Sequence, residues 1–288
     1  MSGANASPAG RSHQEMGGAN ASPTGRSHQE MGGSFFLSTS VFWRREIVRF
    51  LRQRSRIVGA LGTPVIFWLL LGFGVGDSFS PAGQSQTMRY QEYFFPGTVV
   101  LILLFTAIFS TISIIEDRKE GFLQAVLVAP VPRSAFVFGK LLGGTSLAFI
   151  QGVLFMLLAP MVGIPVSSIP LTLLLLVLVA FSLTALGYII AWRMDSTQGF
   201  HAIMNLLLIP MWLLCGAVFP VSGAHAWLRP VIAINPLTYG LSAVRWSIYG
   251  NEVASTMGLP GFALSVTVTI VFGAIMFGAA IAMTRRPA

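Results

Sequence analysis

The sequence has 288 residues, of which 54% are hydrophobic and only 10% are charged. Soluble domains carry about 25% charged residues, so this composition excludes a soluble protein and indicates an integral membrane protein. The length leaves room for about six helical spans of ~20 residues. The net charge is +8, but no basic surface with base-stacking aromatic residues is apparent, and we expect no nucleic-acid partner.

The first 34 residues are an almost perfect tandem repeat, in which residues 4–18 recur as residues 19–33 with Thr24 in place of Ala9. The repeat is rich in small and polar residues and has no apolar run. We therefore expect residues 1–34 to form a disordered tail and not a signal peptide or a span. The single cysteine, Cys215, excludes an intrachain disulfide, and its apolar surroundings predict a buried thiol.

Residues 38–56 have the pattern of a basic amphipathic helix. Four arginines share one face: Arg45, Arg49, Arg52 and Arg56. Apolar and aromatic residues occupy the opposite face: Trp43, Ile47, Phe50 and Leu51. This pattern predicts a helix in the membrane interface, with its apolar side toward membrane lipid and its arginines at anionic headgroups. A helix bound to a partner protein is the alternative, but a span begins directly afterwards and favours the interface.

Six apolar runs follow, at about residues 57–76, 94–115, 135–159, 171–192, 200–221 and 261–283. Basic residues favour the cytoplasmic ends of spans. With the N-terminus inside, all 18 lysines and arginines except Arg89, Arg229 and Arg245 lie on the cytoplasmic side. The sequence therefore predicts an all-α, multi-pass protein of the cell membrane with both termini in the cytoplasm.

The segment 222–260 is expected to form short helices at the outer side. It contains tryptophans and tyrosines, which favour the membrane–water boundary. An apolar face is spaced as on a helix: Leu237, Leu241, Val244 and Ile248. Asn235 and Pro236 form a start signal. We predict extracellular re-entrant helices that dip into the outer leaflet and cap the bundle; an interfacial helix without a role in gating is the alternative.

Ionisable side chains are nearly absent from the predicted spans. Lys140 and His201 lie near cytoplasmic ends, where we expect them to reach water. Asp195 is expected to cap the fifth span, with Ser196 and Thr197 nearby. Polar residues within spans are expected to join helices by hydrogen bonds: Gln151, Thr184 and Asn205.

Two further features concern the shape and packing of the spans. Pro210 is expected to kink the fifth span, where it could act as a hinge. Gly139-x-x-x-Gly143 permits a close helix contact.

Five consecutive charged residues, 116–120, separate the second and third spans, so this piece lies in water. Helical spacing follows from Phe122, and Pro130 with Pro132 ends the helix. A short helix in water between two spans is suited to binding a protein outside the membrane. We predict that it docks an ATPase through Glu116, Arg118, Glu120, Gly121, Leu123, Val126, Leu127, Pro130 and Arg133.

No catalytic or nucleotide motif is present. The only Gly-Lys pair, Gly139-Lys140, is followed by Leu141 and has Ser134 where a P-loop needs its first glycine. No H-E-x-x-H sequence, paired cysteines or Ser/His/Asp set is found either. We expect no enzyme activity, metal or cofactor on this chain, so any nucleotide site belongs to another chain.

Three segments carry a resemblance to a known family. Residues 120–133, EGFLQAVLVAPVPR, with GKL at 139–141, are similar to E-G-T-L-E-x-L-L-x-x-P-[VI]-x-R with its downstream G-K. Residues 215–220, CGAVFP, are similar to S-G-x-x-[FY]-P. Residues 227–239 are similar to W-[LI]-x-x-[LI]-x-x-x-N-P-[LF]-T-[YH]. Over residues 36–286 the chain resembles the membrane subunits of type-2 ABC exporters, the daunorubicin-resistance-like and polysaccharide-export-like permeases.

The resemblance implies a half-transporter, in which two permease copies form a dimer, as a homodimer or with a second permease. Two ABC ATPase subunits bind below with ATP and Mg²⁺. It makes the basic helix the family's connecting helix and residues 122–129 its coupling helix. The outer helices would form an extracellular gate with Phe219, Pro220, Trp227, Asn235, Pro236 and Tyr239. Phe122 departs from the usual Thr and removes a capping hydroxyl, Cys215 replaces a Ser, and the repeated tail has no counterpart.

The function predicted from the sequence is ATP-driven export of an amphipathic or lipid-like substrate such as a drug, lipid or glycan. A proton-coupled secondary carrier is the alternative, and it would need a buried titratable residue. A membrane-embedded enzyme is a third reading, disfavoured by the missing catalytic groups.

Overall fold

The computed structural model describes residues 27–75, 88–221 and 224–285, and this part of the chain contains helices and no strand. Residues 1–26 of the predicted disordered tail lie outside it. The helices are α1 (Ser27–Arg52), α2 (Arg54–Val75), α3 (Tyr90–Ser110), α4 (Ile112–Lys119), α5 (Phe122–Val128), α6 (Arg133–Met156), η2 (Ala159–Val162), α7 (Ile169–Trp192), α8 (Thr197–Trp212), η3 (Leu213–Ala217), α9 (Leu228–Ile234), α10 (Pro236–Thr256) and α11 (Phe262–Arg285).

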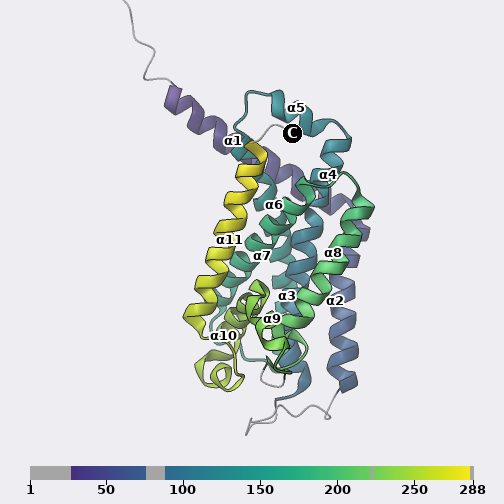
Figure 1. Ribbon diagram of the computed structural model, residues 1–288, viewed down its shortest axis with the longest axis vertical. Helices are drawn as coiled ribbons and strands as arrows, with labels where there is room; N and C mark the ends of the chain where they lie inside the picture. Colours follow the sequence, from purple (N-terminus) through teal and green to yellow (C-terminus); the bar gives the residue numbers. More distant parts are fainter. Residues whose placement is uncertain (1–26, 76–87, 222–223, 286–288) are drawn as a thin grey trace, which may run out of the picture.

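The six predicted spans are confirmed. Six helical stretches are long and apolar enough to cross a membrane: Ile57–Gly74, Tyr90–Lys119, Arg133–Val162, Ile169–Trp192, Thr197–Ala217 and Phe262–Arg285. They form one bundle, with α5 and the last turn of α11 at one end and α9 and α10 at the other (Figure 1). We call these the α5 end and the α10 end. The most apolar window of the α3–α4 stretch is 89% buried and that of α11 only 17%, so α3 is central and α11 peripheral.

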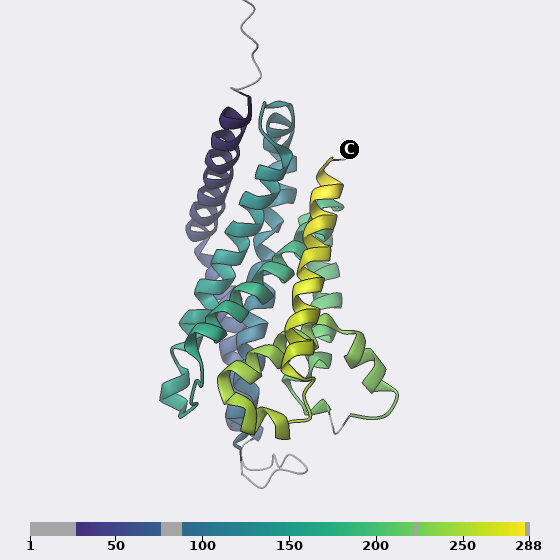
Figure 2. The same ribbon diagram turned by 90° about the vertical axis from the view of Figure 1, so that its left-hand side faces the viewer.

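Helix α1 packs along α6 at the α5 end of the bundle (Figures 1 and 2). The contact is close because Gly139 and Gly143 face α1. A Cβ atom on Gly139 would lie 2.5 Å from the Phe42 Cβ, and one on Gly143 would lie 2.5 Å from the Glu46 Cβ. The close helix contact predicted from this glycine pair is thus confirmed.

The bounds of α1 differ from the sequence prediction. The helix begins at Ser27, inside the second copy of the repeat, and ends at Arg52. The residues from Gln29 to Met31 favour helix, and α1 extends further toward the N-terminus than the sequence predicts. The predicted tail is therefore helical from Ser27 onward.

Polar groups in the spans follow three different patterns. Gln151 accepts a hydrogen bond from Thr106 at 2.7 Å and joins α6 to α3, as predicted. Thr184 instead donates to the Ala180 carbonyl within its own helix. Asn205 lines a groove between α2, α3 and α8. The cap of α8 is Ser196, which accepts from the Gly199 amide, so the cap predicted at Asp195 is wrong.

The α10 end is built from broken helices. Asn235 caps α10, because its Oδ1 accepts from the Leu237 amide at 3.0 Å, which confirms the predicted start. The predicted apolar face of α10 is buried: Leu237, Leu241, Val244 and Ile248. Helix α8 leaves α-helical geometry in η3, where Gly216 has φ 85°. The departure lies beyond Pro210, the predicted hinge.

Candidate functional site

The element between the second and third spans is a helical hairpin at the α5 end. Gly121, with φ 74°, separates α4 from α5, a conformation that glycine adopts without strain. Leu123 is buried, and Val126 and Leu127 pack partly against the core. The outward face of α5 exposes Gln124, Ala125 and Val128, and Pro130 beyond it is also exposed. The predicted helix 122–129 is therefore present almost residue for residue.

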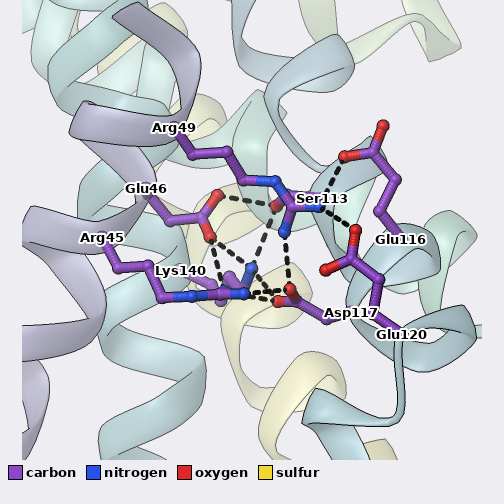
Figure 3. Close-up of polar contacts among 8 residues, drawn as sticks. All are labelled: Arg45, Glu46, Arg49, Ser113, Glu116, Asp117, Glu120 and Lys140. Carbon is purple, nitrogen blue, oxygen red and sulfur yellow. Dashed lines mark hydrogen bonds and ion pairs between the residues drawn. The ribbon is translucent and has the colours of Figure 1, made fainter. Parts of the chain in front are cut away.

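Asp117 of α4 is the centre of a buried ion cluster between α1, α4 and α6 (Figure 3). Its side chain is 0% exposed. Arg45 donates to both carboxylate oxygens, at 2.7 and 3.0 Å, and Arg49 donates to Oδ1 at 2.6 Å. Lys140 of α6 lies 2.5 Å from Oδ2. One carboxylate thus holds three cations from two other helices.

A second carboxylate, Glu46 of α1, completes the buried part of the cluster. It accepts hydrogen bonds from Lys140 and, at 2.6 Å, from Ser113 of α4. Lys140 also donates to Ser113 at 3.0 Å. At the edge, Arg49 contacts Glu116 at 3.0 Å and Glu120 at 3.1 Å. We call these eight residues the α1–α4–α6 cluster: Arg45, Glu46, Arg49, Ser113, Glu116, Asp117, Glu120 and Lys140.

The cluster overturns two sequence predictions. Arg45 and Arg49 face protein carboxylates and not lipid headgroups, and Lys140 does not reach water, since its side chain is only 3% exposed. The physical reason is Asp117: a buried carboxylate attracts the nearest cations more strongly than headgroups exposed to water. Buried titratable residues are therefore present, contrary to the expectation used against a proton-coupled carrier.

The other residues of the predicted interfacial face have mixed positions. Phe50 is buried in the protein, and Trp43 is 39% exposed with its indole N–H bonded to Ser146. Arg52 is exposed, and the side chain of Arg56 lies outside the described part. The exposed side of α1 carries mainly apolar residues: Phe36, Leu37, Val41, Val48 and Leu51.

Burial and charge act in opposite directions on Arg49. Burial alone would lower the pKa of its guanidinium, but the carboxylates of Asp117, Glu116 and Glu120 hold that pKa above its usual value. Arg49 therefore stays charged. Charges this deeply buried are stable only while each keeps its partners, because an unpaired buried charge is strongly unfavourable.

Two arginines that flank α5, Arg118 of α4 and Arg133 at the start of α6, cap the ends of spans. Arg118 donates to the carbonyls of Trp192 and Met194 at the end of α7 and to Asp195 at 2.7 Å. Arg133 donates to the Arg285 carbonyl at 3.0 Å at the end of α11. Helix ends leave carbonyls without partners, and these cations supply the donors. Both residues were predicted to take part in ATPase coupling; in the structure Arg118 ties α4 to α7, and Arg133 ties the start of α6 to α11.

Phe122 stands where the permeases that this chain resembles usually have Thr, and its ring contacts α1. The guanidinium of Arg45 lies 3.7 Å from the centre of its ring, a cation–π contact. Phe42 meets the same ring edge to face. Phe122 therefore joins α5 directly to α1 beside Asp117.

A groove of about 640 Å³ runs between α2, α3 and α8. It is lined mainly by apolar and aromatic side chains, including Phe67, Phe105 and Trp212. Its polar groups are few: Thr63, His201 and Asn205. The ring of His201 packs 5.2 Å from that of Phe109, so this side chain faces the groove. Among the described residues, no group of three His, Cys, Asp or Glu side chains is placed to hold a metal ion.

The residues predicted for an outer gate lie together at the α10 end. Asn235 donates to the Met211 carbonyl at 2.6 Å and ties the α9–α10 corner to α8. Tyr239 bonds the Ala233 carbonyl. Phe219 and Pro220 are half-buried after η3, Pro236 is the first residue of α10, and Trp227 is 66% exposed.

Four residues of the cluster were not predicted as site residues from the sequence: Glu46, Ser113, Asp117 and Lys140. A signal was present in each case. Glu46 is an acid between two arginines, and Lys140 directly follows a glycine at a close helix contact. Ser113 and Asp117 are four residues apart, on one helical face. Arg245, on the buried face of α10, was also missed.

Taken together, the bundle, the α4–α5 element and the apolar groove define a multi-pass membrane protein with a helix presented at one end. The sequence profile of the family described as "ABC-2 type transporter" matches residues 38–249. The chain therefore belongs to the ABC-2 type transporter family, as a permease subunit. This family implies partnership with an ABC ATPase.

Relatives with transport names support this assignment. The chain is 27% identical over 220 residues to the "Putative transport permease ycf38" of Cyanophora paradoxa, covering 74% of this chain and 75% of that protein. It is 23% identical over 252 residues to "Nodulation protein J" of Rhizobium leguminosarum bv. viciae, covering 85% and 92%. It is 22% identical over 223 residues to the "Inner membrane transport permease YadH" of Escherichia coli (strain K12), covering 76% and 86%.

Proposed function

We propose that this permease subunit exports an amphipathic or lipid-like substrate, driven by ATP hydrolysis on two copies of a separate ABC ATPase that hold ATP and Mg²⁺. Two permease copies form the membrane unit. The observation that carries the proposal is the α4–α5 element, a short helix held rigidly at one end of a six-span bundle with an exposed outer face.

The α5 end is assigned to the cytoplasm, with both termini there. The excess of lysine and arginine at this end supports the assignment, because such residues favour the cytoplasmic side. The α10 end then faces outward, and α9 and α10 cap the bundle there.

Force from the ATPase would enter through α5 and spread by three routes. The α1–α4–α6 cluster links α4 to α1 and α6, Arg118 links it to α7, and Arg133 links the start of α6 to α11. A rigid connection of this kind moves several spans together when α5 moves. Glu120, which was proposed to dock the partner, is 59% exposed and stays available at the edge.

The groove between α2, α3 and α8 is the proposed substrate path. Its aliphatic and aromatic lining with few polar groups suits a cargo with a large apolar part. A second permease copy facing it would close the open side of the groove.

Docking is tested at Val128, whose side chain is 86% exposed on α5. A Val128→Glu substitution should lower ATPase binding about tenfold, because a charge replaces an apolar contact in the centre of a small interface. The measurement is the affinity of the purified permease for its ATPase, which is identified by pull-down from native membranes and mass spectrometry.

The matched control is Met161→Glu, since Met161 is 82% exposed at the α10 end. It should leave ATPase binding unchanged. Equal losses for the two variants, or no ATPase in the pull-down, would contradict the proposal. Substrate accumulation under a proton gradient without ATP would instead establish the carrier.

The path is tested by filling the groove. Gly59 lines it, and a Cβ there meets no atom within 4 Å. Gly59→Trp should lower ATP-dependent uptake of a rhodamine dye into inside-out vesicles at least about tenfold, because the indole would occupy the groove and misplace the substrate. ATPase binding should not change. Gly278→Trp on α11, where a Cβ is equally free, should transport normally. Equal uptake by both variants would exclude this path.

A further inference from the structure

At the α10 end, one backbone carbonyl of α3 and one of η3 lie where the helical hydrogen-bond pattern is interrupted. In α3, Pro96 has no backbone N–H, so the Glu92 carbonyl lacks its usual helical donor. After α8, the π turn of η3 and the positive φ of Gly216 take the chain out of the α-helical pattern. A buried carbonyl without a donor is unfavourable, so the carbonyls of Glu92 and Gly216 need donors from elsewhere in the chain.

One face of α10 supplies these partners. The Tyr249 hydroxyl donates to the Glu92 carbonyl. The Nη2 of Arg245 donates to the Gly216 carbonyl at 2.9 Å and to the Tyr93 carbonyl at 3.2 Å. Because positions 245 and 249 are four apart, they lie on the same helical face. This face therefore fastens the outer ends of α3 and η3 to each other.

Arg245 is buried and forms no ion pair with a carboxylate of the described residues. It is 1% exposed. Its other contacts are the Tyr93 hydroxyl at 3.4 Å and the Tyr93 ring, whose centre lies 4.2 Å from the guanidinium. Its Nε has no hydrogen-bond partner among the described residues. Because burying a cation is unfavourable without compensation, this arrangement depends on the two carbonyls staying where they are.

We propose that Arg245 is a positioning residue that latches the α10 end, holding η3 against α3 until the transport cycle moves α8. The proposal rests on the proposed function. When η3 moves away, the guanidinium loses the Gly216 carbonyl and turns to water at the outer surface. The Tyr93 hydroxyl, which donates to the same carbonyl at 2.8 Å, releases at the same step.

Movement of η3 can be followed by labelling Cys215. Cys215 is the only cysteine, it precedes Gly216, and it is 2% exposed. A membrane-impermeant maleimide is applied from the outer side to vesicles that hold the permease with its ATPase. In the parent protein, labelling should be slow without ATP and faster during ATP hydrolysis.

The Arg245→Gln variant should label at least about tenfold faster without ATP, because a charge-assisted hydrogen bond to the Gly216 carbonyl is lost. ATP should then add little. Arg245→Lys keeps the charge but not the forked geometry, so its labelling should be intermediate and still respond to ATP. That graded response to ATP would not follow from a purely structural role.

Arg229→Gln is the matched control, since Arg229 is an exposed arginine of α9 at the same end. It should label like the parent. If Arg245→Gln does not accumulate in the membrane, Tyr249→Phe tests the same face by removing only a hydroxyl, and labelling should rise about fivefold.

Parent-like labelling of Arg245→Gln, or of Tyr249→Phe where the first variant is not obtained, would overturn the latch, as would fast labelling of Arg229→Gln. A different labelling result would show that the proposed function is wrong. The parent would then label at the same rate with and without ATP, while Arg245→Gln would still label faster.

Discussion

Replacing Asp117 with Asn should lower the free energy of unfolding of the permease by about 3–5 kcal/mol, because a buried ion network then loses its central charge. The carboxylate left to Arg45 would be Glu46, at 3.9 Å, in place of two short contacts to Asp117. Arg49 and Lys140 would each lose one of their carboxylates. The measurement is unfolding of the purified protein in mixed micelles with increasing denaturing detergent.

The control for this prediction is Asp195→Asn. Asp195 also binds an arginine, Arg118, at 2.7 Å, but its side chain is 88% exposed. Exposed pairs contribute less than about 1 kcal/mol, so this variant should unfold almost like the parent. A loss at Asp117 no larger than the loss at Asp195 would mean that the cluster contributes specificity and not stability. The same Asp117→Asn protein should still bind the ATPase, because α5 remains in place. Its transport should be reduced, because the link from α4 to α1 is weakened.

Much of this architecture follows from the sequence, for physical reasons. The spans are set by the thickness of the hydrocarbon layer, and α5 is bounded by a glycine and a proline, so local patterns are sufficient. The start of α10 at Asn235 likewise depends only on neighbouring residues. These features need no knowledge of which helices touch.

The ion cluster could not be derived in the same way. An arginine face on a helix looks the same whether it meets lipid headgroups or a buried acid. The decision depends on α1 packing against α6, a contact between residues about 100 positions apart. Arg245 and Tyr249 pose the same problem, because they donate to backbone carbonyls beside the irregular geometry at Gly216 and Pro96. A backbone carbonyl that accepts from a distant side chain cannot be identified from the residue types alone.

The second large effect is expected at the glycines that let α1 approach α6. A Cβ on Gly139 would lie 2.5 Å from the Phe42 Cβ and 2.9 Å from the Thr39 carbonyl oxygen. Since the second contact is with backbone, no rotamer change relieves it. Gly139→Ala should therefore destabilise the protein by about 1–3 kcal/mol.

The consequence reaches the cluster, because Gly143 sets the distance to Glu46 in the same way. Adding Gly143→Ala to Gly139→Ala should push α1 off α6, part Lys140 from Glu46, and expose Arg45 and Arg49 to trypsin. The control is Gly278→Ala on α11, where a Cβ meets no atom within 4 Å. Alanine favours helix over glycine by about 1 kcal/mol, so that variant should be as stable as the parent or more so. If the alanines at 139 and 143 were tolerated equally well, α1 would not be held by α6, and the cluster could not transmit movement from α5 to the bundle.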